Sequence, residues 1–253
     1  MLNYSVLIRF AIATAVLAGT SGWLPAQDQP DQARLALKFA RHFEDRPPVT
    51  FELEATGDHP GRILVTNALQ YPLTAIAIEI ASEEGSKLPA QTHIYDALTR
   101  SQLSAPIARG LTFVTYVGHT AGKTIPNAII TAAIWEDGST YGPSDVLNLI
   151  LEGRRNTLAA FDRTLSILQS GIDADWTSSR YLTALEAEKQ PNMGLSGMNE
   201  YQTHVAATAV VYGAESTIRV QAEKGKNLAH IAKVLQHVLK QQRDQLADSA
   251  PAL

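Results

Sequence analysis

The stretch between Ile129 and Leu168 divides the sequence into two kinds of pattern. Residues 129–135 form a run rich in isoleucine and alanine that reaches a turn sequence at residues 136–139. Beyond residue 143, apolar residues recur every three or four positions, which is the spacing of an amphipathic helix. The runs before this junction are patterned as strands and the runs after it as helices. We therefore expect an α+β fold in which the strands come first.

The sequence from residue 49 to residue 142 predicts an antiparallel β-sandwich of the immunoglobulin or fibronectin type. Val49, Phe51 and Leu53 alternate with polar residues, as in a half-buried strand. Similar short runs, separated by glycine and proline turns, recur at residues 62–69, 73–80, 93–98, 111–117 and 129–135. In the runs 73–80 and 129–135 one face is mostly small. We expect these to be central strands whose small faces are covered by the helices that follow.

Residues 143–247 are expected to form a helical region that packs on the sandwich. Ser144 is a favourable N-cap, and Asp145 suits the positive end of the helix dipole. The first helix is expected to end at Gly171. Its apolar stripe consists of Leu147, Leu151, Leu158, Phe161, Leu165 and Leu168. Further helices are predicted from about Asp173 to Pro191, over residues 200–212 and over residues 216–246, followed by a frayed tail at residues 248–253.

Residues 1–26 have the pattern of a secretory signal peptide. Arg9 precedes an apolar run and a small, polar group at residues 10–22, and cleavage is expected near Ala26. An apolar run of about ten residues is too short to span a bilayer core of about 30 Å, although an uncleaved membrane anchor is the alternative. In the N-terminal segment that follows, residues 27–48, the stretch 32–43 is compatible with a short helix.

The absence of cysteine bears on the compartment. The chain contains no cysteine, so it forms no disulfide and carries no lipidated N-terminal cysteine. Export without disulfides fits a bacterial periplasm or cell surface better than a small secreted eukaryotic module. The predicted location is therefore periplasmic or secreted.

Composition and motifs argue against several classes of function. The net charge is −4, which does not favour the basic surface that nucleic acid requires. The seven histidines lack the spacing of metal ligands. Gly122-Lys123-Thr124 lacks the glycine that a phosphate loop requires five positions earlier, where this chain has Val117. We predict no catalytic residue, no metal and no cofactor.

One row of basic residues in the last predicted helix is a candidate binding surface. It consists of Lys226, His230, Lys233, His237 and Lys240. These side chains recur with helical spacing but lie off the expected apolar stripe of the same helix, which is Leu228, Ile231, Leu235 and Val238. They predict docking to an acidic partner or to anionic lipid headgroups. The alternative is an ordinary solvated helix face.

Arg154 lies within the apolar stripe of the first predicted helix. A buried guanidinium must find a carboxylate or several carbonyl groups, because a buried unpaired charge is very costly. We expect a structural ion pair that joins this helix to the sandwich. The candidate partners are Glu136, Asp137, Glu186 and Glu188. Snorkelling of the side chain to the surface is the alternative.

Two functions of different classes are compatible with these observations. The first is an exported, non-catalytic binding or structural module of the cell envelope, whose partner is a protein or an envelope polymer and not a nucleic acid. The second is a hydrolase with a site at the interface of sandwich and helices. Its candidate residues are His59, His119, Asp137 and Arg154. Membrane contact is expected only if the N-terminal segment is retained.

Overall fold

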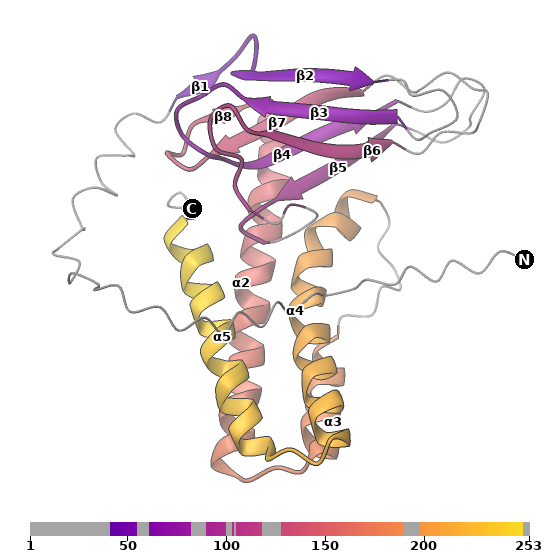
Figure 1. Ribbon diagram of the computed structural model, residues 1–253, viewed down its shortest axis with the longest axis vertical. Coiled ribbons are helices and arrows are strands. Elements are labelled where there is room, and N and C mark those ends of the chain that lie inside the picture. The colour runs from indigo at the N-terminus through magenta and orange to yellow at the C-terminus, as the bar shows by residue number, and fades with distance from the viewer. Residues whose placement is uncertain are drawn as a thin grey trace, which may run out of the picture.

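The computed structural model of the protein describes residues 41–54, 61–81, 90–99, 103, 105–117, 128–189 and 198–249. Over these residues the chain is a mixed α+β fold with two sheets, of five and three strands, and four helices. The strands come first and the helices follow, and Figure 1 shows the helices extending away from the sheets. The predicted signal peptide and the last four residues lie outside the described part.

The two sheets contain every strand predicted from residue 49 onward, with ends shifted by no more than two residues. The larger sheet has the order β1 (His42–Phe43), β8 (Thr140–Tyr141), β7 (Ala128–Trp135), β4 (Leu73–Ile80), β5 (Gln91–Asp96). The smaller has the order β2 (Val49–Glu54), β3 (Gly61–Asn67), β6 (Thr112–Val117).

Strand β1 was not predicted. It lies outside residues 49–142 and runs parallel to β8, whereas the strand pairs within the predicted sandwich are antiparallel, as expected. The prediction of a short helix over residues 32–43 is wrong at His42 and Phe43, which form β1. Residues 32–40 lie outside the described part. The reason is local: the Arg41 carbonyl accepts a hydrogen bond from the Thr140 N–H (2.7 Å), so this backbone is paired with the β8 hairpin instead of with itself.

The main core lies between the two sheets. Ile63 and Val65 of β3 belong to the same buried cluster as Ile76 and Ile78 of β4, and Trp135 of β7 completes it. All five side chains are at most 1% exposed. Since β3 is in one sheet and β4 and β7 are in the other, this cluster is the contact that holds the sheets face to face.

The opposite face of the larger sheet is built from small residues, as predicted, and is covered by the first helix. Ala75 and Ala77 of β4 and Ala132 of β7 are fully buried against Ile150 of helix α2 (Ser144–Asp173). Their small side chains allow the helix to approach the strands closely. The prediction that the following helices cover these two central strands is confirmed.

Helix α2 is the element on which the other helices assemble. Helix α4 (Met198–Glu223) and helix α5 (Leu228–Ser249) both pack on α2 more than on each other, and α3 (Ser178–Glu188) packs mainly on α4. With 30 residues, α2 is about 45 Å long. Helices α4 and α5 extend along α2 away from the sheets, with α4 also contacting β5, and we call these four helices the helical arm. The α4–α5 turn lies at the far end of this arm (Figure 1).

The buried line of α2 differs from the predicted leucine stripe. The buried residues nearest to heptad spacing are Ile150, Arg154, Thr157, Phe161, Thr164, Leu168 and Gly171. Four of the predicted leucines are only half-buried, because this line is shifted by about one position around the helix. Thr157 tolerates burial since its hydroxyl donates to the Gly153 carbonyl (2.8 Å).

Helix ends are where the sequence-based predictions fail most. Pro143, and not Ser144, is the N-cap of α2. The predicted helices at 200–212 and 216–246 are wrong in their division, because α4 continues through Gly213. It ends instead at Gly225, which has φ +66° and whose N–H donates to the Ala222 carbonyl (2.9 Å). This is the left-handed C-terminal cap that glycine favours.

The prediction that α2 ends at Gly171 is wrong, because this glycine lies inside the helix and contacts the ring of Tyr181. A Cβ atom at this position would lie 2.1 Å from the ring of Tyr181, which is 1% exposed. We expect Gly171→Ala to destabilise the protein by about 2 kcal/mol, because the ring must move. Gly213→Ala is the matched control: its Cβ would meet nothing within 4 Å, so this change is expected to stabilise α4 by up to about 1 kcal/mol. Urea unfolding of both variants checks the prediction, and a loss of stability in both would contradict it.

Candidate functional site

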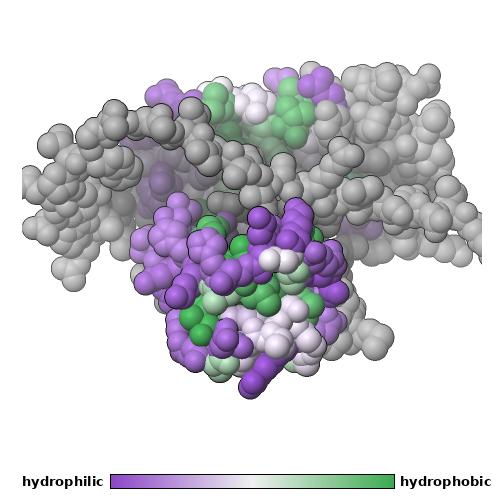
Figure 2. Space-filling view, turned by 60° about the horizontal axis from the view of Figure 1, so that its bottom comes forward, coloured by the Kyte–Doolittle hydropathy of each residue, from purple (hydrophilic) through white to green (hydrophobic). Residues whose placement is uncertain are grey.

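The predicted basic row lies on the outer surface of the helical arm. Lys226 is in the α4–α5 turn, and His230, Lys233, His237 and Lys240 are on α5; all five are exposed. We call these five residues the basic face. In the space-filling view of the far end of the arm, hydrophilic side chains surround a smaller apolar area (Figure 2).

The apolar contact of α5 matches the predicted stripe only in part, since Ile231 and Leu235 pack against the core of the helices as half-buried residues. The buried residues of α5 are Ala232, Leu239 and Leu246, seven residues apart, whereas Val238 is 41% and Val234 50% exposed. Alanine at position 232 lets α5 approach its neighbours through this line, which turns Val238 outward. The basic face stays exposed under this rotation because it lies well around the helix from the buried line.

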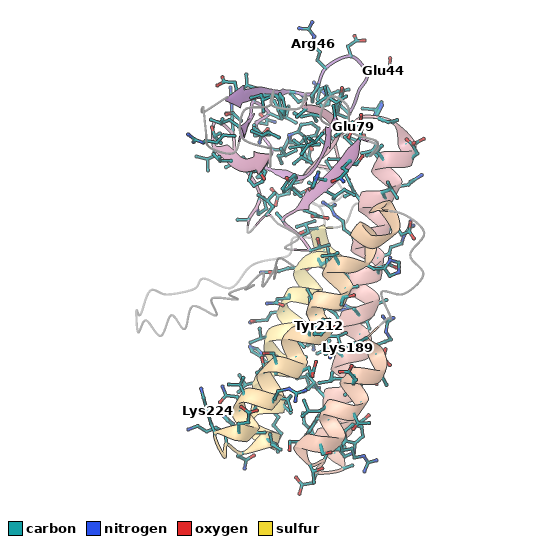
Figure 3. The ribbon with its side chains drawn as sticks, turned by 90° about the vertical axis from the view of Figure 1, so that its right-hand side faces the viewer. Glu44, Arg46, Glu79, Lys189, Tyr212 and Lys224 are labelled. Atoms are coloured by element: carbon teal, nitrogen blue, oxygen red, sulfur yellow. The ribbon has the colours of Figure 1, made fainter. Side chains whose placement is uncertain are left out.

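The basic face belongs to a segment without acidic residues. No aspartate or glutamate occurs between Glu223 and Asp244. The lysines of the basic face form no ion pair with any other residue that the structure describes. Lys224 adds a further cation at the end of the arm (Figure 3). The lysines of the basic face are therefore not held by close ion pairs with described neighbours.

One edge of α5 is fixed to α2 by polar contacts. The Gln236 side-chain amide donates to Gln169 Oε1 (2.8 Å), and Arg243 Nε donates to Asp162 Oδ1 (3.0 Å). These exposed contacts contribute little stability on their own, but they set the rotation of α5 about its axis. Lys233 and Lys240 are exposed beside this edge, and His230 and His237 lie further around the helix from it.

Arg154 is a structural residue in this fold. It is fully buried, its Nε donates to Asp96 Oδ2 (2.8 Å), and its Nη2 donates to Asp96 Oδ1 (3.2 Å) and Thr74 Oγ1 (3.1 Å). The partner at the end of β5 is none of the four acids that we expected. A bidentate pair between α2 and the larger sheet locks the first helix to the strands and leaves the guanidinium inaccessible to a ligand.

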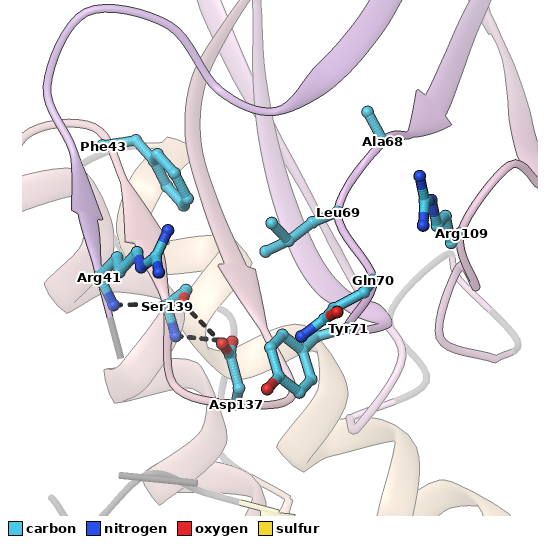
Figure 4. A pocket seen from close by; sticks show the side chains of 9 residues that line it. All are labelled: Arg41, Phe43, Ala68, Leu69, Gln70, Tyr71, Arg109, Asp137 and Ser139. Carbon is cyan, nitrogen blue, oxygen red and sulfur yellow. Dashed lines mark hydrogen bonds between the residues drawn. The ribbon is translucent and has the colours of Figure 1, made fainter. Parts of the chain in front are cut away.

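A pocket of about 560 Å³ lies at one end of the two sheets, away from the contacts of Arg154. Four chain segments meet there: residues 41–43, the β3–β4 loop, the turn before β6 and the β7–β8 hairpin. Its walls are formed by Arg41, Phe43, Ala68, Leu69, Gln70, Tyr71, Arg109, Asp137 and Ser139 (Figure 4).

Asn67 organises the wall of this pocket from inside the fold. Its side chain is fully buried and donates to the carbonyls of Tyr71 (2.8 Å) and Ile107 (2.9 Å). Its Oδ1 accepts from the Leu69 N–H (3.0 Å) and from Trp135 Nε1 (3.0 Å). One amide thus ties the β3–β4 loop to the segment before β6 and to β7. The role of Asn67 was not predicted, because the only signal in the sequence is an asparagine at the end of a strand pattern.

The charged residues of the pocket differ in their state of pairing. The buried Asp137 carboxylate accepts from the Ser139 N–H (3.0 Å) and from Ser139 Oγ (2.8 Å). The guanidinium groups of Arg41 and Arg109 are exposed and form no hydrogen bond or ion pair with another described residue. The pocket therefore combines one satisfied acid with two cations that remain available.

The candidate hydrolase residues do not form one site within the described part of the chain. His59 and His119 lie outside the described part of the chain. The contacts of Asp137 and those of Arg154 share no residue, and Arg154 does not line the pocket.

A second buried acid occurs between α3 and α4. Glu215 is 6% exposed and forms ion pairs with Lys189 and Arg219. The Lys189 contact lowers the pKa of Glu215, burial opposes this shift, and Arg219 lowers the pKa further. Lys189 also lies over the ring of Tyr212, 4.3 Å from its centroid (Figure 3). These contacts join the end of α3 to α4, so we interpret the cluster as structural.

No protein-family model, no curated protein and no solved structure matches this chain. Within the described ranges, no three histidine, aspartate or glutamate side chains are grouped so that they could hold a metal ion. Among the helices described here, none is both long and apolar enough to cross a membrane.

Proposed function

We propose that this protein is an exported, non-catalytic binding module of the cell envelope that docks an acidic partner through the basic face of α5. The observation that carries the proposal is the exposure of all five basic-face residues on a segment of the chain that contains no acidic residue. An acidic protein segment or an anionic envelope polymer has the complementary charge.

The length of the arm supports docking as opposed to enclosure of a small ligand. Four of the five basic-face residues lie along α5, and Lys233 and Lys240 are about 10 Å apart, since positions seven residues apart on a helix are separated by two turns. A partner with repeated negative charges along an extended chain or a helix matches this spacing. Single exposed ion pairs contribute only about 0.2–1 kcal/mol each, so the partner must contact several of the cations at once.

The export part of the proposal rests on the N-terminal sequence. Arg9, the apolar run that follows it and the small residues before Ala26 have the order of a signal peptide. The cysteine-free composition suits an envelope location in bacteria. We propose the periplasm or the cell exterior as the compartment.

We further infer that residues 49–142 form a sandwich domain of the immunoglobulin or fibronectin type, with residues 143–247 as the helical region. Strand order supports this inference. Strands β2, β3 and β6 form one sheet, and β4, β7 and β8 lie together in the other. When β2 is counted as the first strand of the sandwich, these are strands 1, 2 and 5 and strands 3, 6 and 7. That division is the one found in immunoglobulin-like sandwiches. The fourth strand, β5, differs from the constant-type arrangement because it pairs with β4.

Charge reversal on the basic face tests the docking proposal. We expect Lys233→Glu combined with Lys240→Glu to weaken binding of the full-length protein to poly-L-glutamate at least about tenfold at low salt, because two attractions become repulsions. The control is Arg46→Glu combined with Arg155→Glu, which makes the same change in net charge at exposed positions outside the basic face. Binding is measured by fluorescence anisotropy of the labelled polymer.

The control decides between a local and a global electrostatic effect. We expect the control pair to change the affinity less than about threefold, because its positions lie outside the proposed contact. Equal losses in both variants would show that only net charge matters. That result, or a wild-type protein that does not bind the polymer, would contradict the proposal.

A further inference from the structure

The geometry of the pocket at the end of the two sheets points to a second binding site, which takes an organic carboxylate with an apolar or aromatic body. This site is independent of the basic face, since none of its lining residues belongs to a helix.

The two cations of the pocket provide the anion-binding part. Arg41 precedes β1 and Arg109 lies in the turn before β6, so they come from segments far apart in the sequence. Figure 4 shows Arg41 with Phe43 on one side of the pocket and Arg109 on the other, with Leu69 between them. A guanidinium presents paired N–H donors that match a carboxylate, and neither arginine has a described protein partner to give up.

The walls between the arginines select an apolar body. Phe43, Leu69 and Tyr71 are half-buried and present carbon surface to the pocket. Phe43 is held by an edge contact with Trp135, at 5.6 Å between ring centroids. A ligand with a ring or a branched apolar group gains by covering these surfaces. The volume of about 560 Å³ is within the range of small-molecule sites.

The buried Asp137 disfavours ligands with several negative charges. Its carboxylate belongs to the pocket lining, and its two hydrogen bonds from Ser139 keep it in place. A phosphate or a dicarboxylate would bring additional negative charge toward this group, whereas a monocarboxylate places its single charge at one arginine and its apolar body on the walls between the two. The ligand class is therefore a monocarboxylate.

The pocket is largely preformed. The Asn67 side chain fixes the β3–β4 loop by two hydrogen bonds, with Leu69 and Tyr71, and is itself held by two more, with Ile107 and Trp135. The Gly110 N–H donates to the Asn67 carbonyl (2.8 Å), which fixes the turn that carries Arg109. Arg41 is held through its backbone N–H, which donates to Ser139 Oγ (3.2 Å). Walls held by backbone contacts leave the arginine side chains free to meet a ligand without a cost in refolding.

Matched acid and amide probes test the site in the full-length protein. The probes are N-acetyl-phenylalanine, its amide N-acetyl-phenylalaninamide, and a hexapeptide with a C-terminal phenylalanine as the free acid. We expect at least one of the two acids to bind at least about tenfold more tightly than the amide, measured by titration calorimetry or ligand-observed NMR. Binding of the peptide alone would identify a peptide terminus as the ligand, and binding of both acids a small carboxylate.

Variants separate the pocket from general electrostatics. Of Arg41→Gln and Arg109→Gln, the one that removes the arginine contacting the carboxylate is expected to lower the affinity for the bound acid about tenfold and to leave the amide unchanged. A loss in neither variant would overturn the proposal. Arg46→Gln, at an exposed arginine outside the lining, is expected to have no effect (Figure 3). Unfolding curves confirm that each variant is folded. Equal binding of acid and amide, absence of acid binding up to about 10 mM, or an equal loss in Arg46→Gln would overturn the proposal.

Discussion

Arg154→Met is expected to destabilise the protein by about 3–5 kcal/mol. The change removes the bidentate partner of Asp96 and leaves a carboxylate buried without its counter-charge. It also removes the hydrogen bond that Arg154 Nη2 donates to Thr74 Oγ1. Methionine has a similar length, so loss of packing is a minor part of the effect. Denaturant unfolding of the variant beside the wild type measures the difference.

The double variant Arg154→Met with Asp96→Leu is the control. Removing both charges eliminates the unpaired carboxylate, and apolar replacement of a buried ion pair is often neutral. We expect it to recover most of the stability lost in the single variant. The part not recovered comes from the hydrogen bond that Asp96 Oδ1 accepts from the Leu98 N–H (3.0 Å). A single variant within 1 kcal/mol of wild type, by contrast, would show that this pair does not lock α2 to the sheet.

Asn67→Ala is expected to destabilise the protein by about 3 kcal/mol or more. Four hydrogen bonds are lost at once, and the indole N–H of Trp135, which is deep in the fold, is left without its partner. The Ile107 carbonyl keeps the hydrogen bond that it accepts from the Leu73 N–H. Each buried polar group without a partner costs about 1–3 kcal/mol, although neighbouring groups relax in part. The same denaturant measurement applies.

Gln70→Ala provides the comparison for Asn67. Gln70 is exposed, lies in the same loop and lines the same pocket. Its replacement is expected to change stability by less than about 0.5 kcal/mol. If the two substitutions had similar effects, the buried amide would not be the organiser of the loop.

The strands were predictable because their signal is local. Alternation of Val49, Phe51 and Leu53 with polar residues reports a half-buried strand from the sequence alone. The small faces of β4 and β7 likewise implied a second covering layer, and Ala75, Ala77 and Ala132 do pack on α2. The pairing of strands into two sheets depends on contacts between distant segments.

The helix ends depended on tertiary context. Gly213 and Gly225 are equivalent as residue types, yet only Gly225 has a positive φ and ends a helix. Gly171 is helical because Tyr181 packs on it, which requires the position of α3. Local propensity cannot distinguish a glycine that ends a helix from one that admits a neighbouring ring.

The two candidate sites differ in how far their residues are separated along the chain. The basic face is contiguous in sequence, so helical spacing was sufficient to group Lys233 with Lys240. The pocket brings together Arg41 and Arg109 from different ends of the strand region, and no pattern along the chain joins them. The same holds for Asp96 as the partner of Arg154, because β5 and α2 meet only when the helix is packed on the sheet.

Amide hydrogen exchange of the full-length protein, with and without poly-L-glutamate, tests the docking proposal most directly. The expected result is slower exchange confined to residues 226–240, with the strands unchanged, since a bound partner covers the basic face and stabilises α5 locally. Unchanged exchange over these residues in the presence of bound polymer, or protection confined to the strands, would contradict it.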